Sequence, residues 1–136
     1  MDLNAKNFYV PAIELSNGEF NNLMAHAESM PQCRLGLPLF YAGHIPIVTY
    51  LLCEGYVNFF DENQKLSCRV GQGHILGFIE LHHNRSSALT AQAMPNTSLG
   101  YLDKSTINQL ITSKTRSGQI LENYLNCFAS FSLENV

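Results

Sequence analysis

The sequence predicts a mainly β protein, a double-stranded β-helix (jelly roll) with flanking N-terminal and C-terminal α-helices. From Gly36 onward, short runs rich in Val, Ile, Tyr and Phe follow one another at close spacing, which is typical of a β-sandwich or barrel. Before and after this region, apolar residues recur at helical spacing instead. With 136 residues, 46% of them hydrophobic, the chain suffices for a single domain over residues 1–136. Glycines separate the β runs at Gly43, Gly55, Gly71, Gly73 and Gly77.

The first predicted element is a helix over residues 16–29. Ser16 followed by Glu19 forms a capping box, in which each side chain satisfies a backbone N–H of the other residue. Phe20, Leu23, Met24 and Ala27 then recur at the spacing of one helix face. We expect Pro31 to end this helix.

The β core is expected over about residues 36–111. Its strands are predicted near residues 37–41, 47–53, 56–60, 65–70, 89–93 and 98–102. The polar run at residues 61–64 predicts a hairpin turn. Asp103 is predicted to cap a helix that carries Ile107, Leu110 and Ile111, and a last helix follows over about residues 117–131.

Composition excludes several classes of protein. A formal net charge of -3 and 14% charged residues leave no surplus of cations for nucleic acid. The longest apolar stretch, residues 45–53, is far shorter than the roughly 20 residues of a membrane span, so we expect a cytoplasmic protein. There is no CxxC pair, and Cys53 and Cys68 are predicted to be buried free thiols within strands. The two other cysteines are Cys33 and Cys127.

Residues 36–111 resemble a known family in the order of their motifs. The stretch "LGLPLFYAGHIPIVTYLLCEGYVNFFDENQKLSCRVGQGHILGFIEL" is similar to the effector domain of the cyclic-nucleotide-binding family, which includes the catabolite activator and fumarate-nitrate regulator proteins. In that family a strand of the type "YLL..G.V" precedes a turn of the type "G..LG..EL". A segment of the type "A...A" then leads to the hinge helices.

The resemblance implies that the segment from Gly71 to Ala93 is a phosphate cassette. In the family, backbone N–H groups, an Arg and a Ser or Thr bind the cyclic phosphate, and a Glu binds the ribose. Here Phe78 stands where the Glu is expected, Ser87 where the Arg is and Ala88 where the Ser or Thr is. Cyclic nucleotide is therefore not expected as a ligand, although a loop shifted by two residues would recruit Arg85. The candidate residues of this degenerate cassette are Gly77, Phe78, Ile79, Glu80, Arg85, Ser86, Ser87 and Ala88.

The family's regulators carry a helix-turn-helix domain after their long helix, and this sequence ends at Val136. We expect a non-enzymatic regulatory or scaffold protein that binds other proteins. The alternative is a stand-alone sensor subunit for a cyclic nucleotide or another small ligand. The family pairs through its C-terminal helix, so a homodimer is expected here, against the open alternative that the helix packs on its own domain. Its seam residues, at spacings of three, four and three, are Leu121, Tyr124, Phe128 and Phe131.

A metal-binding jelly roll of the cupin type is the less favoured alternative. Cupins need an HxH pair, whereas His82 and His83 are adjacent and would face opposite sides of a strand. We expect these two, like His26 and His44, to lie at the surface. His74 forms no HxH pair with another histidine. No metal or cofactor is expected. Glu54 and Glu80 form no carboxylate pair and are predicted to be solvated. Since the sequence shows no nucleophile with a recognisable base, we do not expect an enzyme.

Overall fold

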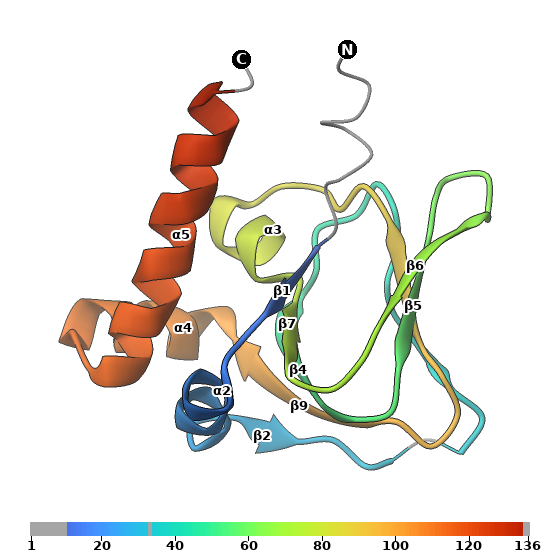
Figure 1. Cartoon of the computed structure of the whole chain (residues 1–136), viewed down its shortest axis with the longest axis horizontal. Helices are drawn as coiled ribbons and strands as arrows, with labels where there is room; N and C mark the ends of the chain where they lie inside the picture. Colours follow the sequence, from blue (N-terminus) through green and yellow to red (C-terminus); the bar gives the residue numbers. More distant parts are fainter. Residues whose placement is uncertain (1–10, 33, 135–136) are drawn as a thin grey trace.

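The computed structural model describes residues 11–32 and 34–134, with side chains described up to residue 127. Two antiparallel sheets form a β-sandwich of jelly-roll type, and helices flank it (Figure 1). The helices are α2 (Asn17–Met24), α3 (Phe78–His83), α4 (Lys104–Ser113) and α5 (Arg116–Glu134). The strands are β1 (Ala12–Glu14), β2 (Glu28–Ser29), β3 (Leu37–Phe40), β4 (Val48–Glu54), β5 (Val57–Phe60), β6 (Leu66–Val70), β7 (His74–Leu76), β8 (Thr90–Ala93) and β9 (Ser98–Asp103).

The strands pair across long stretches of sequence. One sheet has five strands in the order β1-β7-β4-β9-β2, and the other has four in the order β3-β8-β5-β6. In the first, Tyr50 of β4 lies opposite Tyr101 of β9, and in the second, Phe59 of β5 lies opposite Ala91 of β8. The predicted fold class, a mainly β jelly roll with flanking helices, is confirmed.

The two sheets enclose an apolar core between them, here called the interior core. The aromatic rings of Phe40 and Phe59 meet there with their centroids 6.4 Å apart. Strands of both sheets contribute, because alternate residues of each strand face the other sheet. The members of the interior core are Phe40, Leu52, Val57, Phe59, Leu76, Leu89, Ala91, Ala93 and Leu99.

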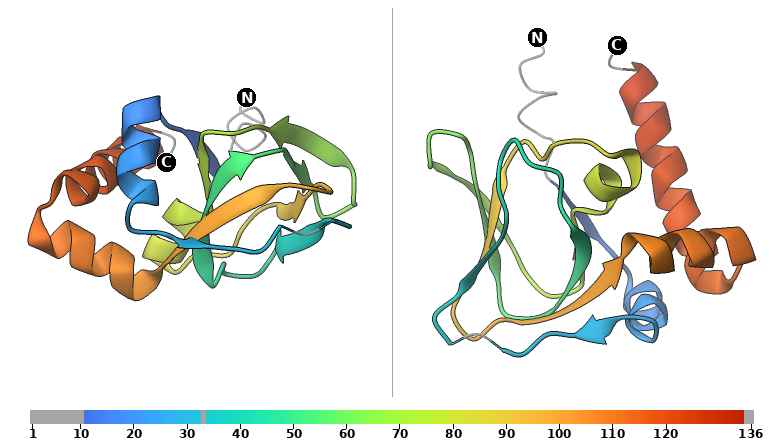
Figure 2. Two further views of the ribbon diagram at one scale, coloured as in Figure 1. Left: turned by 90° about the horizontal axis from the view of Figure 1, so that it is seen from below. Right: turned by 180° about the vertical axis from the view of Figure 1, so that it is seen from behind.

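A second core lies between the five-stranded sheet and the helices, here called the helix-side core. Leu51 and Leu52 are adjacent on β4, so Leu51 faces this core while Leu52 faces the interior core. This two-sided burial explains why β4 reads as a continuous apolar run. The helices gather on this side of the β structure in both views of Figure 2. The members are Leu15, Leu23, Leu51, Ile75, Phe78, Ile79, Leu81, Leu102, Ile107, Leu110, Ile120 and Leu121.

Local signals in the sequence predicted several elements correctly. The capping box is present: the backbone N–H of Glu19 donates to the Ser16 hydroxyl, and the backbone N–H of Ser16 donates to the Glu19 carboxylate. Asp103 caps α4, accepting from the backbone N–H of Thr106 at 2.8 Å. In the predicted hairpin turn, Asp61 accepts from the backbone N–H groups of Asn63 and Lys65.

The predicted extent of the first helix is wrong. The helix ends at Met24, with Ala25 as its C-cap, and so stops before residue 29 and well before Pro31. Glu28 and Ser29 instead form β2, which pairs with Tyr101 and Gly100 of β9. Strand pairing with partners 71 and 73 residues away therefore overrides the helical spacing of this segment.

Two further predictions concern the membrane and the cysteines. Within the described residues, no helix is both long and apolar enough to cross a membrane.

Cys53 and Cys68 are free, as predicted, but each is only half-buried. Burial raises the pKa of both thiols, which keeps them in the neutral form. Cys33 lies outside the described residues.

Candidate functional site

The first candidate residue of the predicted cassette is Gly77, which lies between β7 and α3. Gly77 has a φ of +76°, a left-handed conformation that favours glycine, and its N–H donates to the carbonyl of Pro11 at 2.9 Å. An added Cβ would lie 3.2 Å from the Phe40 ring and 3.3 Å from the Pro46 ring. Glycine is therefore required here both by backbone geometry and by the close approach of the β3–β4 loop.

The next residue, Phe78, packs away from the jelly-roll interior. Its side chain is buried in the helix-side core, together with Ile79 and Leu81. Helix α3 lies between the sheets and α5 (Figure 1), which explains why successive residues of so short a helix are buried. Phe78 thus takes the place expected for a ribose-binding Glu but serves helix packing instead.

The prediction that Glu80 is solvated is wrong. Its side chain is 1% exposed, because α3 is covered on more than one side. Its carbonyl accepts a hydrogen bond from the backbone N–H of Arg85 at 2.8 Å, which closes the turn after α3. Glu54, by contrast, is exposed as predicted.

His82 and His83 lie on a helix, and the prediction that both are at the surface is confirmed for His83 but wrong for His82. His82 and His83 lie at the end of α3, with His83 exposed and His82 half-buried against the Phe78 ring. Burial lowers the pKa of His82 from its ordinary value of 6.5, and the charges of His83 and Lys104 lower it further. Residues 11–32 and 34–134 hold no group of three or more His, Cys, Asp or Glu side chains placed to bind a metal.

The loop after α3 carries the rest of the predicted cassette. Arg85, Ser86 and Ala88 are exposed, whereas Ser87 is 2% exposed. The Ser87 hydroxyl donates to the carbonyl of Leu89 at 2.6 Å and accepts from the backbone N–H of Leu89 at 3.2 Å. Its hydrogen-bonding capacity is therefore used within the loop.

The same loop is fastened to the β3–β4 loop by backbone hydrogen bonds. The N–H of Ser87 donates to the carbonyl of His44 at 2.9 Å, and the N–H of Gly43 donates to the carbonyl of Ser87 at 2.8 Å. After Leu89, strand β8 turns Ala91 and Ala93 into the interior core. The structure therefore brings Gly77 and Ser87 to the same end of the jelly roll, while Phe78 and Ile79 pack into the helix-side core. Glu80 is buried within α3.

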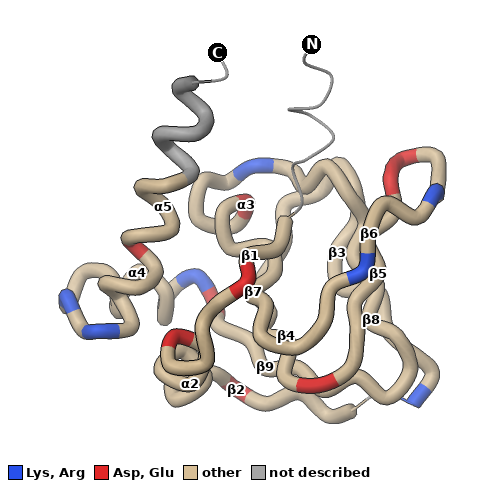
Figure 3. The backbone as a smooth tube through the Cα atoms, viewed as in Figure 1, with Lys and Arg blue, Asp and Glu red and all other residues tan. Residues whose placement is uncertain are grey.

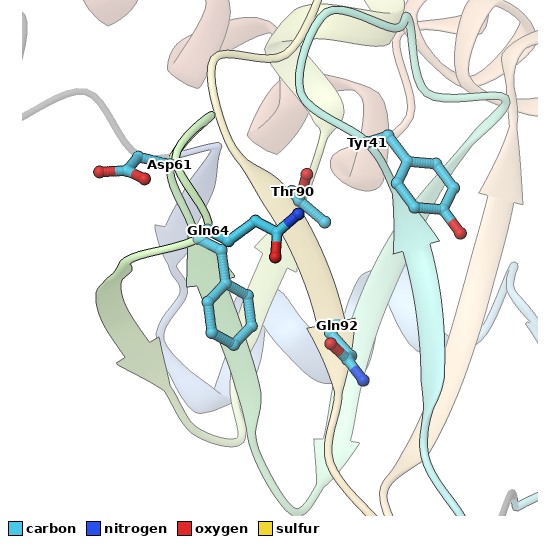
Figure 4. Close-up of a pocket in the computed structure, with 6 residues that line it drawn as sticks. Tyr41, Asp61, Gln64, Thr90 and Gln92 are labelled. Carbon is cyan, nitrogen blue, oxygen red and sulfur yellow. The ribbon is translucent and has the colours of Figure 1, made fainter.

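A pocket that the sequence analysis missed lies on the outer face of the four-stranded sheet (Figure 4). It has a volume of about 280 Å³. The signal that could have found it is the alternation of β8, in which Thr90 and Gln92 face outward between the inward Ala91 and Ala93. The residues that line it are Tyr41, Phe60, Asp61, Gln64, Thr90 and Gln92.

Charged residues do not gather on one face of the described chain. Figure 3 shows Lys and Arg spread over the α4–α5 connection, the β5–β6 hairpin, β6 and the loops. A nucleic-acid surface needs several cations together to neutralise successive phosphates. The described residues present no such basic patch.

Comparison with known proteins shows which proteins share this fold. No family model and no curated protein matches the sequence. Among solved structures, the Thermus thermophilus catabolite activator protein is 21% identical, with a TM-score of 0.65, over 89% of this chain and 56% of that protein. A protein from a cyclic-GMP-dependent signalling pathway that regulates bacterial phytopathogenesis is 15% identical, with a TM-score of 0.69, over 90% and 96%.

A third structure is the regulatory subunit of a cAMP-independent protein kinase A from Trypanosoma brucei. It is 16% identical, with a TM-score of 0.63, over 90% of this chain and 44% of that protein. The chain therefore spans about half the length of the Thermus and trypanosome proteins and nearly all of the phytopathogen protein. At these identities, the likeness shows a shared fold.

Proposed function

We propose that this chain, which has the fold of the cyclic-nucleotide-binding domains, is a non-enzymatic regulatory or scaffold domain that acts by binding other proteins. In this proposal it does not hold a cyclic nucleotide through the usual cassette. One observation carries the proposal: Ser87, at the position expected for the phosphate-binding Arg, is buried with its hydroxyl engaged by the backbone of Leu89.

The charges of the buried residues support this view. A cyclic phosphate enclosed by protein needs a cation, because a charge-assisted hydrogen bond contributes about 1.5–3 kcal/mol and an unpaired buried charge costs more. Among the described residues, no Lys or Arg is buried, and the buried ionisable side chain is the carboxyl of Glu80. A carboxylate has the wrong sign for a phosphate.

The packing of the jelly roll supports it as well. Phe40 and Phe59 are 4% and 0% exposed in the interior core, where Phe40 lies against Gly77 and the Phe59 ring lies 6.4 Å from the Phe40 ring between centroids. A nucleotide entering from the cassette would have to displace these rings. Moving two large aromatic side chains out of a packed core costs several kcal/mol, on the order of 3–5 for each side chain lost.

The binding of other proteins is supported by exposed apolar side chains near the same end of the jelly roll. The β3–β4 loop carries Tyr41, Ile45 and Ile47, of which Ile47 is 86% exposed. Large apolar side chains grouped on a surface mark interaction sites when they form a patch. The trypanosome relative adds a precedent, since it is a regulatory subunit of a cAMP-independent kinase.

Calorimetric titration with cyclic AMP and cyclic GMP tests the proposal. We expect no binding of either nucleotide at micromolar concentration. Micromolar binding would overturn the proposal and favour the alternative role of a stand-alone sensor subunit. If Arg85→Ala then abolished that binding while Arg34→Ala, at another exposed arginine, did not, the shifted loop would be established.

Affinity capture from the native cell, read out by mass spectrometry, tests the binding of proteins. A partner that binds through the β3–β4 loop is lost from Ile47→Ser but retained by Leu66→Ser, an exposed apolar position on β6. Equal retention by both variants would exclude this loop as the docking surface.

A further inference from the structure

The pocket on the four-stranded sheet is separate from the degenerate cassette. Its floor is formed by Thr90 and Gln92, which alternate along β8 with the inward-facing Ala91 and Ala93. The β5–β6 hairpin supplies one wall and the start of the β3–β4 loop supplies the other, with Gln64 and Tyr41 on opposite sides (Figure 4). The interior core therefore lies behind this floor, on the other face of the sheet.

The lining combines two aromatic rings with four polar side chains. The rings belong to Tyr41 and Phe60, and both amides, of Gln64 and Gln92, offer a donor and an acceptor. The Thr90 oxygen accepts from the backbone N–H of Ala42 at 2.9 Å, a bond that leaves the hydroxyl hydrogen to be donated. The lining side chains come from three different segments, and in Figure 4 the Asp61 carboxylate points away from the Gln64 and Gln92 amides.

The sheet holds this lining in place without a ligand. Phe60 lies opposite Thr90, and Asn58 lies opposite Gln92, in the β5–β8 ladder. At the hairpin, one carboxylate oxygen of Asp61 accepts from the backbone N–H groups of Asn63 and Lys65, at 2.8 and 2.9 Å. A site fixed on strands and a tight turn loses little conformational freedom when it binds.

The chemistry of the lining selects among ligands. Among the residues that the structure describes, no Lys or Arg lines the pocket, and Asp61 brings a carboxylate, which disfavours phosphates and other anions. Four polar side chains disfavour a purely apolar ligand. Sugar hydroxyls both donate and accept, as the amides and the Thr90 hydroxyl do, and the C–H face of a sugar ring packs well on an aromatic ring.

We propose that this pocket binds a neutral, polyhydroxylated ligand about the size of a monosaccharide. The volume of about 280 Å³ is close to the lower end of the roughly 300–1,000 Å³ of ligand pockets, which fits one sugar ring with bridging water. This binding site goes beyond the proposed function, because it lies on a different face and uses none of the cassette residues.

Titration of the isotope-labelled protein, followed by amide NMR shifts, tests the site with a panel of D-glucose, D-galactose, N-acetyl-D-glucosamine and myo-inositol. We expect saturable shifts for at least one of them at the backbone amides of residues 41, 60–64 and 90–92. Gln92→Ala should weaken that binding about tenfold, which corresponds to about 1.4 kcal/mol. Gln72→Ala, at an exposed glutamine in the β6–β7 connection, should leave it unchanged.

Gln64→Gly is the second variant, since Gln64 has a φ of +65° that glycine adopts readily. It removes the amide without straining the turn, and it should also weaken binding. The proposal is overturned if no member of the panel gives saturable shifts at these residues, or if both variants bind as the wild type does. Saturable shifts with adenosine but none with the panel would assign the pocket to a nucleobase instead. None of these outcomes bears on the calorimetric test with cyclic nucleotides.

Discussion

At the scale of single residues, two glycines in helices have opposite surroundings. A Cβ added to Gly118 in α5 would lie 2.0 Å from the carbonyl oxygen of Leu110 in α4, whereas one added to Gly18 in α2 would meet no atom of the described residues within 4 Å. The backbone of α5 can therefore approach α4 only because residue 118 has no side chain.

We predict that Gly118→Ala lowers the free energy of unfolding by about 3 kcal/mol or more, because backbone has to move to relieve the overlap. Gly18→Ala is the control, and it should raise the free energy of unfolding by roughly 0.5–1 kcal/mol, since alanine is the better helix former. Urea denaturation followed by circular dichroism measures both. Equal stability of the two variants would contradict the close approach of α4 and α5.

At the scale of elements, a hydrogen bond joins α2 to α5 across 105 residues. The hydroxyl of Tyr124 donates to Oε1 of the Glu19 carboxylate at 2.9 Å. This carboxylate oxygen also accepts from the backbone N–H of Ser16. Nearby, the Ser117 hydroxyl donates to the carbonyl of Asn22 at 3.2 Å. Burial and the bond to Glu19 raise the pKa of Tyr124 to about 12.

This contact predicts an acid-sensitive contribution to stability. The backbone hydrogen bond from Ser16, aided by Tyr124, holds the pKa of Glu19 below its ordinary value of 4.5, although burial opposes the shift. A depressed carboxyl pKa stabilises the fold above the unfolded value and loses that effect as the pH falls through the folded value. The free energy of unfolding of the wild type should therefore exceed that of Glu19→Gln above pH 4.5. This difference should shrink as the pH falls below 4.5.

Denaturation over a pH series, from neutral to strongly acidic, measures that difference. Glu122→Gln, at an exposed position of α5, serves as the control and should track the wild type throughout. Tyr124→Phe should cost about 1 kcal/mol at neutral pH, the value of one hydrogen bond. A constant gap between wild type and Glu19→Gln at every pH would exclude the ionised Glu19 as the source.

At the scale of the whole molecule, α5 serves its own domain over its first turns. Ile120 and Leu121 are buried in the helix-side core, and Tyr124 and Leu125 pack against it. Leu121 and Tyr124, two of the four seam residues, are therefore engaged within the chain. The side chains of the other two, Phe128 and Phe131, lie outside the described residues.

The homodimer expected from the sequence stays a prediction, and it now depends on the seam residues Phe128 and Phe131. We predict a dimer at tens of micromolar protein concentration. Two aromatic residues spaced three apart on one helix fall on the same face, which suits packing against a second copy. Replacing both Phe128 and Phe131 by Ser should give a folded monomer, while Asn126→Ser should remain dimeric. Light scattering measures the mass. A monomeric wild type would leave α5 as part of its own core or as the docking face for a different protein.

The sequence by itself determined the features whose cause lies within a few residues. Ser16 with Glu19, Asp103 with Thr106, and Asp61 with Asn63 are side-chain to backbone hydrogen bonds of short range, so their residue types predict them. The β texture from Gly36 onward likewise predicted the six longer strands and the jelly roll, because burial on one or both faces leaves a regular apolar pattern.

Only the tertiary structure decided the features that depend on distant partners. Residues 28–29 became a strand because β9 pairs with them, and Glu80 became buried because other elements cover α3. The pocket on the outer sheet face also needed the fold, since Tyr41, Gln64 and Gln92 come from separate segments. Sequence patterns encode which face of an element is apolar, but the partner that covers this face is set by long-range packing.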